Sequence, residues 1–507
     1  MHQPFRLNKN FYWEKQMFKK KSIEELFNHY FWSELDRKIF ERVAERCYLP
    51  SNEIILRKID EFKHTSKPFK VSFSISGVFL EQCQKFNPQV IDSFKQLAST
   101  GCVEFLEQTY YHSLVSLYED KNEFKEQIRL HRELMLETLE YEPTFFENTE
   151  LIYNNKIAEV VQELGYKGIF TEGVDRILSG KTPNYVYKVK NGSLKVLLRN
   201  YQLTDDIGFR FSSKKWEEYP LTADKYASWL AATPGQCINI FPDYETFGEH
   251  HWPETGIREF LYYLPNEISK WENLKFATPT EIVEKYNAIG EIDVPEFSTI
   301  SWADLNRDTS CWLGNTMQWA CYEYEKELES KVKESGNLTL LKIWRYLGES
   351  DHLYYIYTGS GGPSEVHSYF SPYEHAYNAF ITFFSILHDF DARVRAAIKA
   401  ASDPFIFSYS EHPIKVWSLK GFLEAIEKIS LDSLKYYIER GDFERWIRDS
   451  LGDRELADQV KGLRLGKAGG MDLRRELSDL IDKRLREKYG VERAEEETSK
   501  EEKKEEG

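Results

Sequence analysis

Short apolar runs alternate with longer amphipathic stretches over roughly the first 290 residues of the chain. The runs are rich in β-branched and aromatic residues, which is typical of buried strands; they lie at 70–76, 102–108, 144–150, 167–173, 194–201, 237–245 and 274–278. Stretches with helical spacing, such as 123–141 and 155–169, separate most of them. Because strands that alternate with helices form parallel sheets, the pattern predicts an α/β domain over 1–290.

Acidic residues gather where these runs end. They are Glu104, Glu107, Glu150, Glu172, Asp205, Asp206, Asp243 and Glu245. In a closed barrel the carboxyl ends of the parallel strands meet on one face, which is where barrel enzymes carry their active sites. An open sheet would also place a ligand at strand ends, but in a single crevice. The pattern favours a barrel with an acidic site.

The pattern becomes helical and aromatic after about residue 300, with helices predicted at 310–332, 338–350 and 373–399. We assign 291–402 to a helical domain that completes the cleft of the barrel. The region 403–490 is predicted to be a small, mostly helical appended domain, with a strand region at 405–417 and helices at 419–429, 431–441, 442–451, 454–463 and 471–490. The acidic tail 491–507 is predicted to be disordered.

The chain begins close to a segment that looks like the end of a strand, "HQPFR" at 2–6. An apolar strand would be expected before it. The sequence therefore predicts that the first strand of the barrel is missing, which would leave a strand edge unpaired and His2 poorly held.

Composition narrows the class of partner. The net charge of −16 argues against binding to nucleic acid or to an anionic membrane. We find no apolar run of about 18 residues and no apolar signal region, so no membrane span is predicted and a cytoplasmic location is expected. The six cysteines show no CxxC spacing and are expected to be reduced thiols. The few methionines and many Lys and Glu residues hint at a thermostable protein.

Two constellations could carry chemistry. Glu150 and Asp243 lie at the ends of different predicted strands, and glycoside hydrolysis requires two carboxyl groups that flank one bond. A zinc site built from His2, Asp243 and His251 is the alternative. No HxxxH or HExxH spacing supports that alternative, so no metal and no cofactor are expected.

Five segments point to a family. "HQPFR" (2–6), "VEFLEQTYYH" (103–112), "FFENTELIYNN" (145–155), "IFPDYETFGEHHW" (240–252) and "LGESDHLYY" (347–355) stand in the order of the five short motifs of glycoside hydrolase family 57. Over about residues 2–400 the chain resembles the archaeal α-amylase-like branch of that family. The resemblance implies a (β/α)7 barrel followed by a helical region. It also implies retaining cleavage of α-1,4-glucosidic bonds in glucans of the starch and glycogen type.

The resemblance also implies roles for single residues. Glu150 matches the nucleophile and Asp243 the acid/base of the family, while His2, Glu104 and Asp351 match residues that shape the sugar subsites. Other candidate substrate contacts are His251, Trp252, Trp344 and His352. Burial of Asp243 by Phe241, Tyr244 or Trp252 would favour its protonated, acid form.

One departure from the motifs keeps the outcome of the reaction open. Many family members carry an aromatic residue three positions before the nucleophile, where this chain has Glu147. An α-glucan or maltooligosaccharide is expected as substrate, and a 4-α-glucanotransferase or branching enzyme is the alternative to an α-amylase. A non-catalytic glucan-binding protein is a further alternative, although the intact pair Glu150 and Asp243 argues against it. The sequence leaves a homo-oligomer open.

Overall fold

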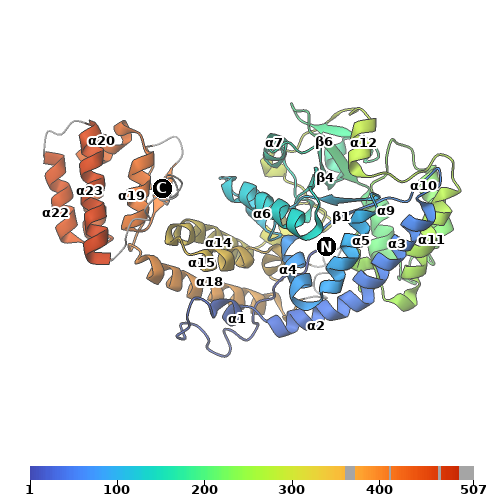
Figure 1. Ribbon diagram of the computed structural model, residues 1–507, viewed down its shortest axis with the longest axis horizontal. Coiled ribbons are helices and arrows are strands. Elements are labelled where there is room, and N and C mark those ends of the chain that lie inside the picture. The colour runs from blue at the N-terminus through green and yellow to red at the C-terminus, as the bar shows by residue number, and fades with distance from the viewer. Residues whose placement is uncertain (360–370, 410–412, 466–469, 490–507) are drawn as a thin grey trace, which may run out of the picture. The chain divides into compact units, whose positions relative to one another are not determined.

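The computed structural model describes residues 1–359, 371–409, 413–465 and 470–489 (Figure 1). The chain forms two compact units. The first contains Met1–Lys326 and Arg345–Leu387, and the second contains Glu327–Trp344 and the chain from His388 onward. The tail 491–507, predicted to be disordered, lies outside the described residues.

Parallel strands form the centre of the first unit. They are β1 (Val71–Ser74), β2 (Val103–Leu106), β3 (Phe145–Glu147), β4 (Gly168–Glu172) and β6 (Lys195–Arg199), joined at one edge by β5 (Tyr187–Val189) and β7 (Glu291–Ile292). β1 pairs with β2, and β4 pairs with both β3 and β6, in each case parallel. A single parallel bridge from Glu107 to Phe146 joins β2 to β3, and another from Arg199 to Asn239 places one residue of the segment 237–245 beside β6. The result is the continuous parallel arc expected of a barrel wall.

Five of the seven predicted strands are confirmed. In the sixth, 237–245, only Asn239 pairs, and the prolines at 234 and 242 flank it and limit pairing. The seventh, 274–278, is not a strand. It leads directly into the capping box of α12 (Pro279–Lys285), and its Thr278 N–H donates to the Glu281 carboxylate instead of to a neighbouring strand.

The start of the chain lies beside the end of β1. The Met1 backbone nitrogen donates to the Ser74 carbonyl at 2.7 Å, and the Ser76 N–H donates to the Met1 carbonyl at 3.1 Å. These bonds pair the first residue with the carboxyl end of β1. The prediction that His2 would be poorly held is therefore wrong.

Helices cover the strands of the first unit, as Figure 1 shows for α3, α5, α7 and α12. The remaining bounds are α1 (Leu26–Tyr30), α2 (Ser33–Val43), α3 (Leu49–Phe62), α4 (Gly77–Phe86), α5 (Pro88–Ser99), α6 (Asn122–Leu139), α7 (Asn155–Glu163), α8 (Asp175–Leu178), α9 (Tyr201–Asp205), α10 (Ala223–Ala232), α11 (Ile257–Ser269), α13 (Ser310–Leu313) and α16 (Ser350–Tyr354). The apolar faces of α3, α4 and α5 pack on β1 and β2 in one aromatic-rich core. A second core lies under α10 and α11.

Three long helices contribute residues to both units: α14 (Thr316–Ser335), α15 (Leu338–Leu347) and α18 (Ala376–Ile398). The second unit adds the antiparallel hairpin of β8 (Phe405–Phe407) and β9 (Ile414–Val416). Its other helices are α19 (Leu419–Lys428), α20 (Leu431–Arg440), α21 (Asp442–Asp449), α22 (Arg454–Leu465) and α23 (Gly470–Tyr489). The predicted apolar stripes of these helices meet in one core with the hairpin, in which Phe422 and Ile447 are fully buried.

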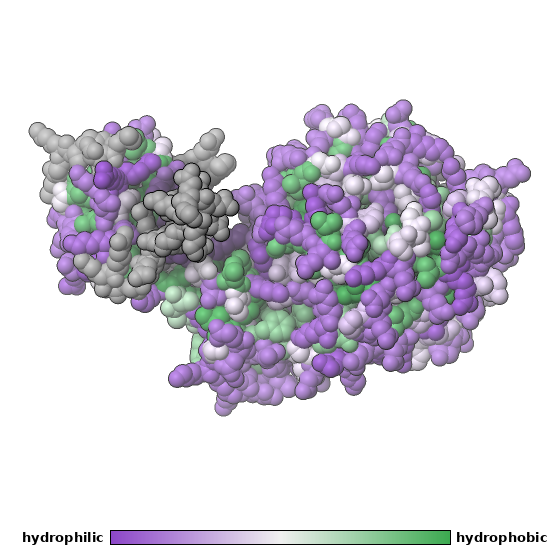
Figure 2. All heavy atoms as spheres, viewed as in Figure 1, coloured by the Kyte–Doolittle hydropathy of each residue, from purple (hydrophilic) through white to green (hydrophobic). Residues whose placement is uncertain are grey.

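Polar residues cover most of the face drawn in Figure 2, and hydrophobic residues show there in separate groups. Within the described ranges, no helix is long and apolar enough to cross a membrane. All six cysteines are free thiols.

Candidate active site

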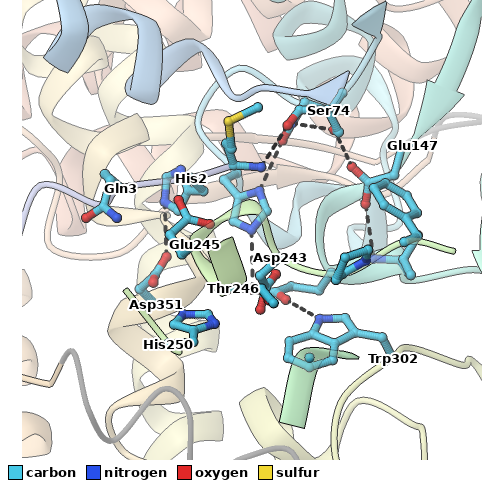
Figure 3. Close-up of a pocket in the computed structure, with 18 of the residues that line it drawn as sticks. His2, Gln3, Ser74, Glu147, Asp243, Glu245, Thr246, His250, Trp302 and Asp351 are labelled. Carbon is cyan, nitrogen blue, oxygen red and sulfur yellow. Dashed lines mark hydrogen bonds and ion pairs between the residues drawn. The ribbon is translucent and has the colours of Figure 1, made fainter. Parts of the chain in front are cut away.

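A cavity of about 140 Å³ opens at the carboxyl ends of the parallel strands in the first unit (Figure 3). Ser74 ends β1, Glu147 ends β3 and Arg199 ends β6, and all three line it. The other lining residues are Met1, His2, Gln3, Pro4, Arg6, Gln108, His112, Glu150, Leu151, Gly208, Phe209, Phe241, Pro242, Asp243, Glu245, Thr246, His250, Trp302 and Asp351. The acidic strand ends predicted from the sequence therefore include members that meet in one site.

Glu150 lies in a tight turn directly after β3 and is buried. Its φ is +59°, a left-handed conformation that a non-glycine residue adopts only when its surroundings impose it. Trp302 Nε1 donates to one carboxylate oxygen at 2.7 Å, and Ser350 Oγ donates to the other at 3.0 Å. His112 Nε2 lies 3.3 Å from the second oxygen. Three donors on one carboxyl group favour its ionised form, as a nucleophile requires.

Asp243 lies shortly after Asn239, the residue that bridges to the end of β6. Its side chain lines the cavity and is exposed there. The three aromatic residues expected to bury it point elsewhere. Phe241 packs on Phe170, and Tyr244 packs into the core against Phe73. Trp252 lies outside the cavity lining, against Arg46. The prediction that these aromatic residues bury Asp243 is wrong: Asp243 is exposed, Tyr244 packs into the core, Phe241 packs on Phe170 and Trp252 lies on the surface.

Two stacked histidines form another wall of the site. The rings of His2 and His112 lie 4.2 Å apart. His2 Nδ1 is 2.7 Å from Ser76 Oγ, and its Nε2 is 3.1 Å from the Asp351 carboxylate. Burial, assisted by the neighbouring charge of His112, lowers the pKa of His2 to about 4 against the opposing pull of Asp351. His2 is therefore neutral at neutral pH.

His112 behaves in the opposite way. Burial disfavours its charged form, but the hydrogen bond and charge of Glu150 outweigh burial and raise the pKa of His112. Asp351 and Glu147 add to this effect. When it is protonated, the His112 ring supports a negative charge on Glu150, which its Nε2 faces.

Glu147 is a further carboxyl group in the cavity, three residues before Glu150. Ser74 Oγ donates to one of its oxygens at 2.7 Å, and the Leu151 N–H lies 3.4 Å from the other. Burial raises the pKa of Glu147. The site therefore combines a carboxyl group surrounded by three donors, Glu150, with a second one, Glu147, whose pKa burial raises.

The cavity brings together four of the predicted site residues: Glu150, Asp243, His2 and Asp351. Glu104 is not among them. Its carboxylate accepts from the Thr280 backbone N–H at 2.9 Å and from the Thr280 hydroxyl at 2.6 Å, at the first turn of α12. The expected contact of Glu104 with sugar is corrected to a helix-capping role, because its carboxyl group is used on the outer side of the barrel wall.

His251 is also outside the cavity lining. Its Nδ1 pairs with Ser212 Oγ at 2.8 Å, and its Nε2 lies 2.9 Å from the Ile207 carbonyl. It anchors the helical turn Asp206–Arg210, whose two end residues form an ion pair. The zinc alternative of His2, Asp243 and His251 is excluded by this placement. The described residues contain no group of three or more His, Cys, Asp and Glu arranged to hold a metal ion.

Three further candidates lie away from the cavity. Trp344 is fully buried in α15, and Trp252 is 53% exposed on the surface. His352 is buried against Phe383, with its Nε2 3.1 Å from the Tyr346 carbonyl. The predictions that Trp344 and His352 contact substrate are wrong, because helix packing buries both side chains. Trp252 lies against Arg46 outside the cavity lining, and its contact with substrate stays a prediction.

The sequence interpretation missed three residues that the structure places at the site. His112 is the last residue of the motif 103–112, so its place in that motif could have identified it as a site residue. His250 adjoins the wrongly chosen His251 and lines the cavity in its place. Trp302 lies 152 positions from its partner Glu150 and outside every motif, so no local signal marked it.

Known proteins resemble the chain in sequence and in fold. The model of the family "Glycosyl hydrolase family 57" matches residues 1–295. A protein of Methanocaldococcus jannaschii named "Putative alpha-amylase" is 47% identical over 409 residues, which are 78% of this chain and 83% of that protein. The alpha-amylase of Pyrococcus furiosus is 25% identical over 265 residues, 51% of this chain, and the chain spans only 38% of that relative.

Two solved structures share the fold. The GH57 branching enzyme of Thermococcus kodakaraensis has a TM-score of 0.53 and 14% identity, over 82% of this chain and 91% of that one. The 4-alpha-glucanotransferase of Thermococcus litoralis has a TM-score of 0.50 and 17% identity, over 73% and 58% of the two chains. These similarities confirm the predicted (β/α)7 barrel fold. With a family model that covers the barrel and a relative 47% identical over most of both chains, this protein belongs to glycoside hydrolase family 57.

Proposed function

We propose that this protein is a retaining glycoside hydrolase that cleaves α-1,4-glucosidic bonds in glucans of the starch and glycogen type. The observation that carries the proposal is the meeting of Glu150 and Asp243, from two separate strand ends, in one cavity. Two carboxyl groups in one sugar-sized site are what glycoside hydrolysis requires. The names of the relatives, alpha-amylases and a 4-alpha-glucanotransferase, supply the class of substrate.

The first chemical step forms a glycosyl-enzyme. A Glu150 carboxylate oxygen attacks the anomeric carbon, the bond from that carbon to the glycosidic oxygen breaks, and Asp243 gives its proton to the departing oxygen. In the second step Asp243 removes a proton from water, whose oxygen attacks the anomeric carbon and releases Glu150. Two inversions return the α configuration to the product.

The surroundings of each carboxyl group support these roles. Trp302 and Ser350 each donate to one oxygen of Glu150, and the raised pKa of His112 favours a positive charge beside it. Asp243 is exposed without substrate. A glucan chain in the cavity would cover it, and the loss of water would favour the protonated form that the first step needs.

Sugar hydroxyl groups need neutral or fixed hydrogen-bonding partners, and the cavity offers several. We assign His2 to this role: its Nδ1 is held by Ser76, and a sugar hydroxyl in the cavity would share or replace the contact of its Nε2 with Asp351. Asp351 is the second substrate-binding residue carried over from the sequence motifs. Glu147 and His250 complete the polar lining.

A 4-α-glucanotransferase or branching enzyme would use the same residues and differ only in whether water or a sugar hydroxyl attacks the intermediate. A non-catalytic glucan-binding protein is disfavoured by the ordered donors around Glu150. Neither step requires a metal or a cofactor. Free cysteines and an acidic chain agree with the proposed cytoplasmic location, and thermostability and oligomeric state stay predictions.

The test is incubation with maltoheptaose, followed by separation of the products by chain length. Shorter oligomers with a gain of reducing ends mean hydrolysis, and oligomers longer than the substrate mean transfer. Glu150→Gln and Asp243→Asn serve as controls, since each keeps the side-chain size and removes one function. An unchanged substrate with the folded wild-type protein would overturn the proposal.

A further inference from the structure

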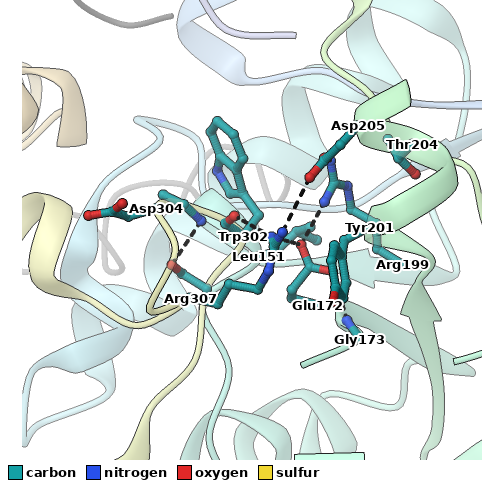
Figure 4. A network of polar contacts seen from close by, with 12 residues as sticks. Leu151, Glu172, Gly173, Arg199, Tyr201, Thr204, Asp205, Trp302, Asp304 and Arg307 are labelled. Carbon is teal, nitrogen blue, oxygen red and sulfur yellow. Dashed lines mark hydrogen bonds and ion pairs between the residues drawn. The ribbon is translucent and has the colours of Figure 1, made fainter. Parts of the chain in front are cut away.

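Four charged side chains form a buried cluster beside the cavity, here called the ion network: Glu172, Arg199, Asp205 and Arg307 (Figure 4). Glu172 ends β4, Arg199 ends β6 and Asp205 ends α9, whereas Arg307 comes from the loop before α13. Each arginine contacts both carboxylates. Arg199 binds Glu172 and Asp205 at 2.7 Å each, and Arg307 binds them at 3.2 Å each. No side chain of the four is more than 12% exposed.

One end of the ion network reaches Glu150. Arg307 Nη1 donates to the Trp302 carbonyl at 3.0 Å, and Trp302 Nε1 donates to the Glu150 carboxylate at 2.7 Å. The Trp302 backbone N–H also lies 3.4 Å from the Glu150 carbonyl. Trp302 belongs to an irregular loop in which Asp304 and Arg307 have positive φ values of 61° and 49°. Backbone bonds fix one side of this loop, where Ile300 bridges Tyr153. The bond from Arg307 to the Trp302 carbonyl adds a side-chain anchor beside the indole.

The other end reaches the segment that carries Asp243. Arg199 Nε donates to the Phe241 carbonyl at 2.9 Å. This segment makes only the single bridge at Asn239, where Asn200 N–H donates to the Asn239 carbonyl at 2.9 Å. The guanidinium of Arg199 therefore holds the chain two residues before Asp243.

We propose that the ion network is a positioning device that sets the placement of Glu150 relative to Asp243. Arg307 acts through Trp302 on the nucleophile, and Arg199 acts through the Phe241 backbone on the acid. Their shared carboxylates, Glu172 and Asp205, couple the two ends. The inference rests on the proposed function, which gives the two carboxyl groups their roles.

Arginine suits this task because its planar fork makes several directed bonds at once. Arg307 uses it on two carboxylates and one carbonyl while its guanidinium lies 3.9 Å above the Tyr201 ring. A lysine would keep the charge but could not reproduce the fork. Misplacement of a catalytic group by about 1 Å costs roughly a hundredfold in rate, so loss of the fork is expected to reach the chemical step.

The experiment uses Arg307→Gln in the full chain, because Arg307 does not line the cavity and Arg199 does. Two substrates separate the two ends of the network. The sugar that leaves from maltoheptaose must be protonated by the acid, whereas the nitrophenolate that leaves from a 4-nitrophenyl α-maltooligoside needs little protonation. Misplacement of Glu150 slows both substrates. We expect kcat to fall about a hundredfold on each, with KM changed by less than about threefold.

Arg199→Gln should behave differently. Because it loosens the segment of the acid, its kcat should fall at least about tenfold more on maltoheptaose than on the nitrophenyl substrate. A purely structural role would slow both substrates alike in both variants. If Arg199→Gln lowers kcat to the same extent on both substrates, as Arg307→Gln is expected to do, the proposed division of roles is overturned.

Arg345→Gln is the matched control. Arg345 is a buried arginine of the same unit, paired with Glu123 at 2.7 Å and outside the cavity lining. It should lose stability but keep the wild-type kcat on both substrates. If Arg307→Gln does not fold, Arg307→Lys is measured by the same criteria.

The outcomes separate the two proposals. A folded Arg307 variant with kcat within about threefold of the wild type would overturn the positioning role while leaving the proposed function intact. A wild-type protein that cleaves neither substrate would overturn the proposed function and this inference with it.

Discussion

At the scale of single residues, backbone strain and buried hydrogen-bond donors are concentrated around Glu150. The positive φ of Glu150 and of Leu151 is an unfavourable conformation that the donors and the loop of Trp302 hold in place. The position of the Glu150 carboxylate, the proposed nucleophile, is thus set by groups far away in sequence. Of the site residues, the motifs indicated Glu150, Asp243, His2 and Asp351. Ser350 stands in the motif 347–355 beside Asp351, but its pairing with Glu150 over 200 positions leaves no local pattern. Trp302, 152 positions from Glu150, lies outside every motif and could not be predicted.

Replacement of Glu150 by glycine should be rescued in part by azide. Glu150→Gly is expected to lower kcat by several orders of magnitude, and the small anion can occupy the space of the lost carboxylate and attack the sugar directly. One displacement instead of two gives a β-glycosyl azide. Nuclear magnetic resonance of the product identifies the anomer. Rescue with the same inverted product in Asp243→Gly, and not in Glu150→Gly, would show that the two roles are exchanged.

His352 makes stability depend on pH. Burial lowers the pKa of His352 to about 4 in the folded protein. Between about pH 6.5 and pH 4 the unfolded chain binds a proton that the folded chain does not, so acid destabilises the folded state in this window. His352→Gln should remove about 1.5 kcal/mol of the fall in unfolding free energy between pH 7 and pH 5. Urea unfolding at the two pH values measures it, and an identical fall in both proteins would contradict the prediction.

At the scale of elements, the predictable strands are those with long apolar runs. β1, β2, β3, β4 and β6 were predicted because their residues are buried on both faces, as in a parallel sheet. β5 and β7 were missed, since they are short and carry polar residues such as Lys188 and Glu291 at the edge of the sheet. The edge of the sheet and the start of α12 depend on tertiary contacts that a sequence pattern does not record. One of them is the contact of the Glu104 carboxylate with Thr280.

The role of Glu104 is tested through α12. Glu104→Ala should lower the unfolding free energy by about 1 to 2 kcal/mol, because the Thr280 N–H loses its partner. The kcat and KM on maltoheptaose should stay at wild-type values. Thermal unfolding and steady-state kinetics provide both readouts. A large rise in KM at unchanged stability would instead return Glu104 to the sugar subsites.

At the scale of the whole molecule, the chemistry belongs to the first unit. Every residue that lines the cavity lies in Met1–Lys326 or Arg345–Leu387. The sequence change after Asp403 predicted an appended helical module. It did not predict that the second unit also takes in Glu327–Trp344 and the end of α18. The reason is packing: Trp417 donates its backbone N–H to Glu334 of α14 at 2.8 Å and stacks on Lys331.

A chain that ends at residue 403 should therefore stay active but become less stable. We expect kcat/KM on maltoheptaose within about threefold of the full chain, since no cavity residue is removed. The melting temperature should fall, because removal of Trp417 leaves Glu334 and Lys331 without these contacts. The measurement compares kcat/KM of the truncated and the full chain at a temperature at which circular dichroism shows that the truncated chain is folded. A hundredfold loss there would place part of the active site in the removed region.

The central claim is that Glu150 and Asp243 cleave an α-glucosidic bond by double displacement. It is tested most directly by the anomeric configuration of the first product released from maltoheptaose, followed by proton nuclear magnetic resonance before mutarotation equilibrates it. Double displacement gives the α anomer from the wild-type protein, and this signal should be absent in Glu150→Gln and in Asp243→Asn. A β anomer from the wild-type protein, or an α anomer formed at the same rate by Glu150→Gln, would contradict it.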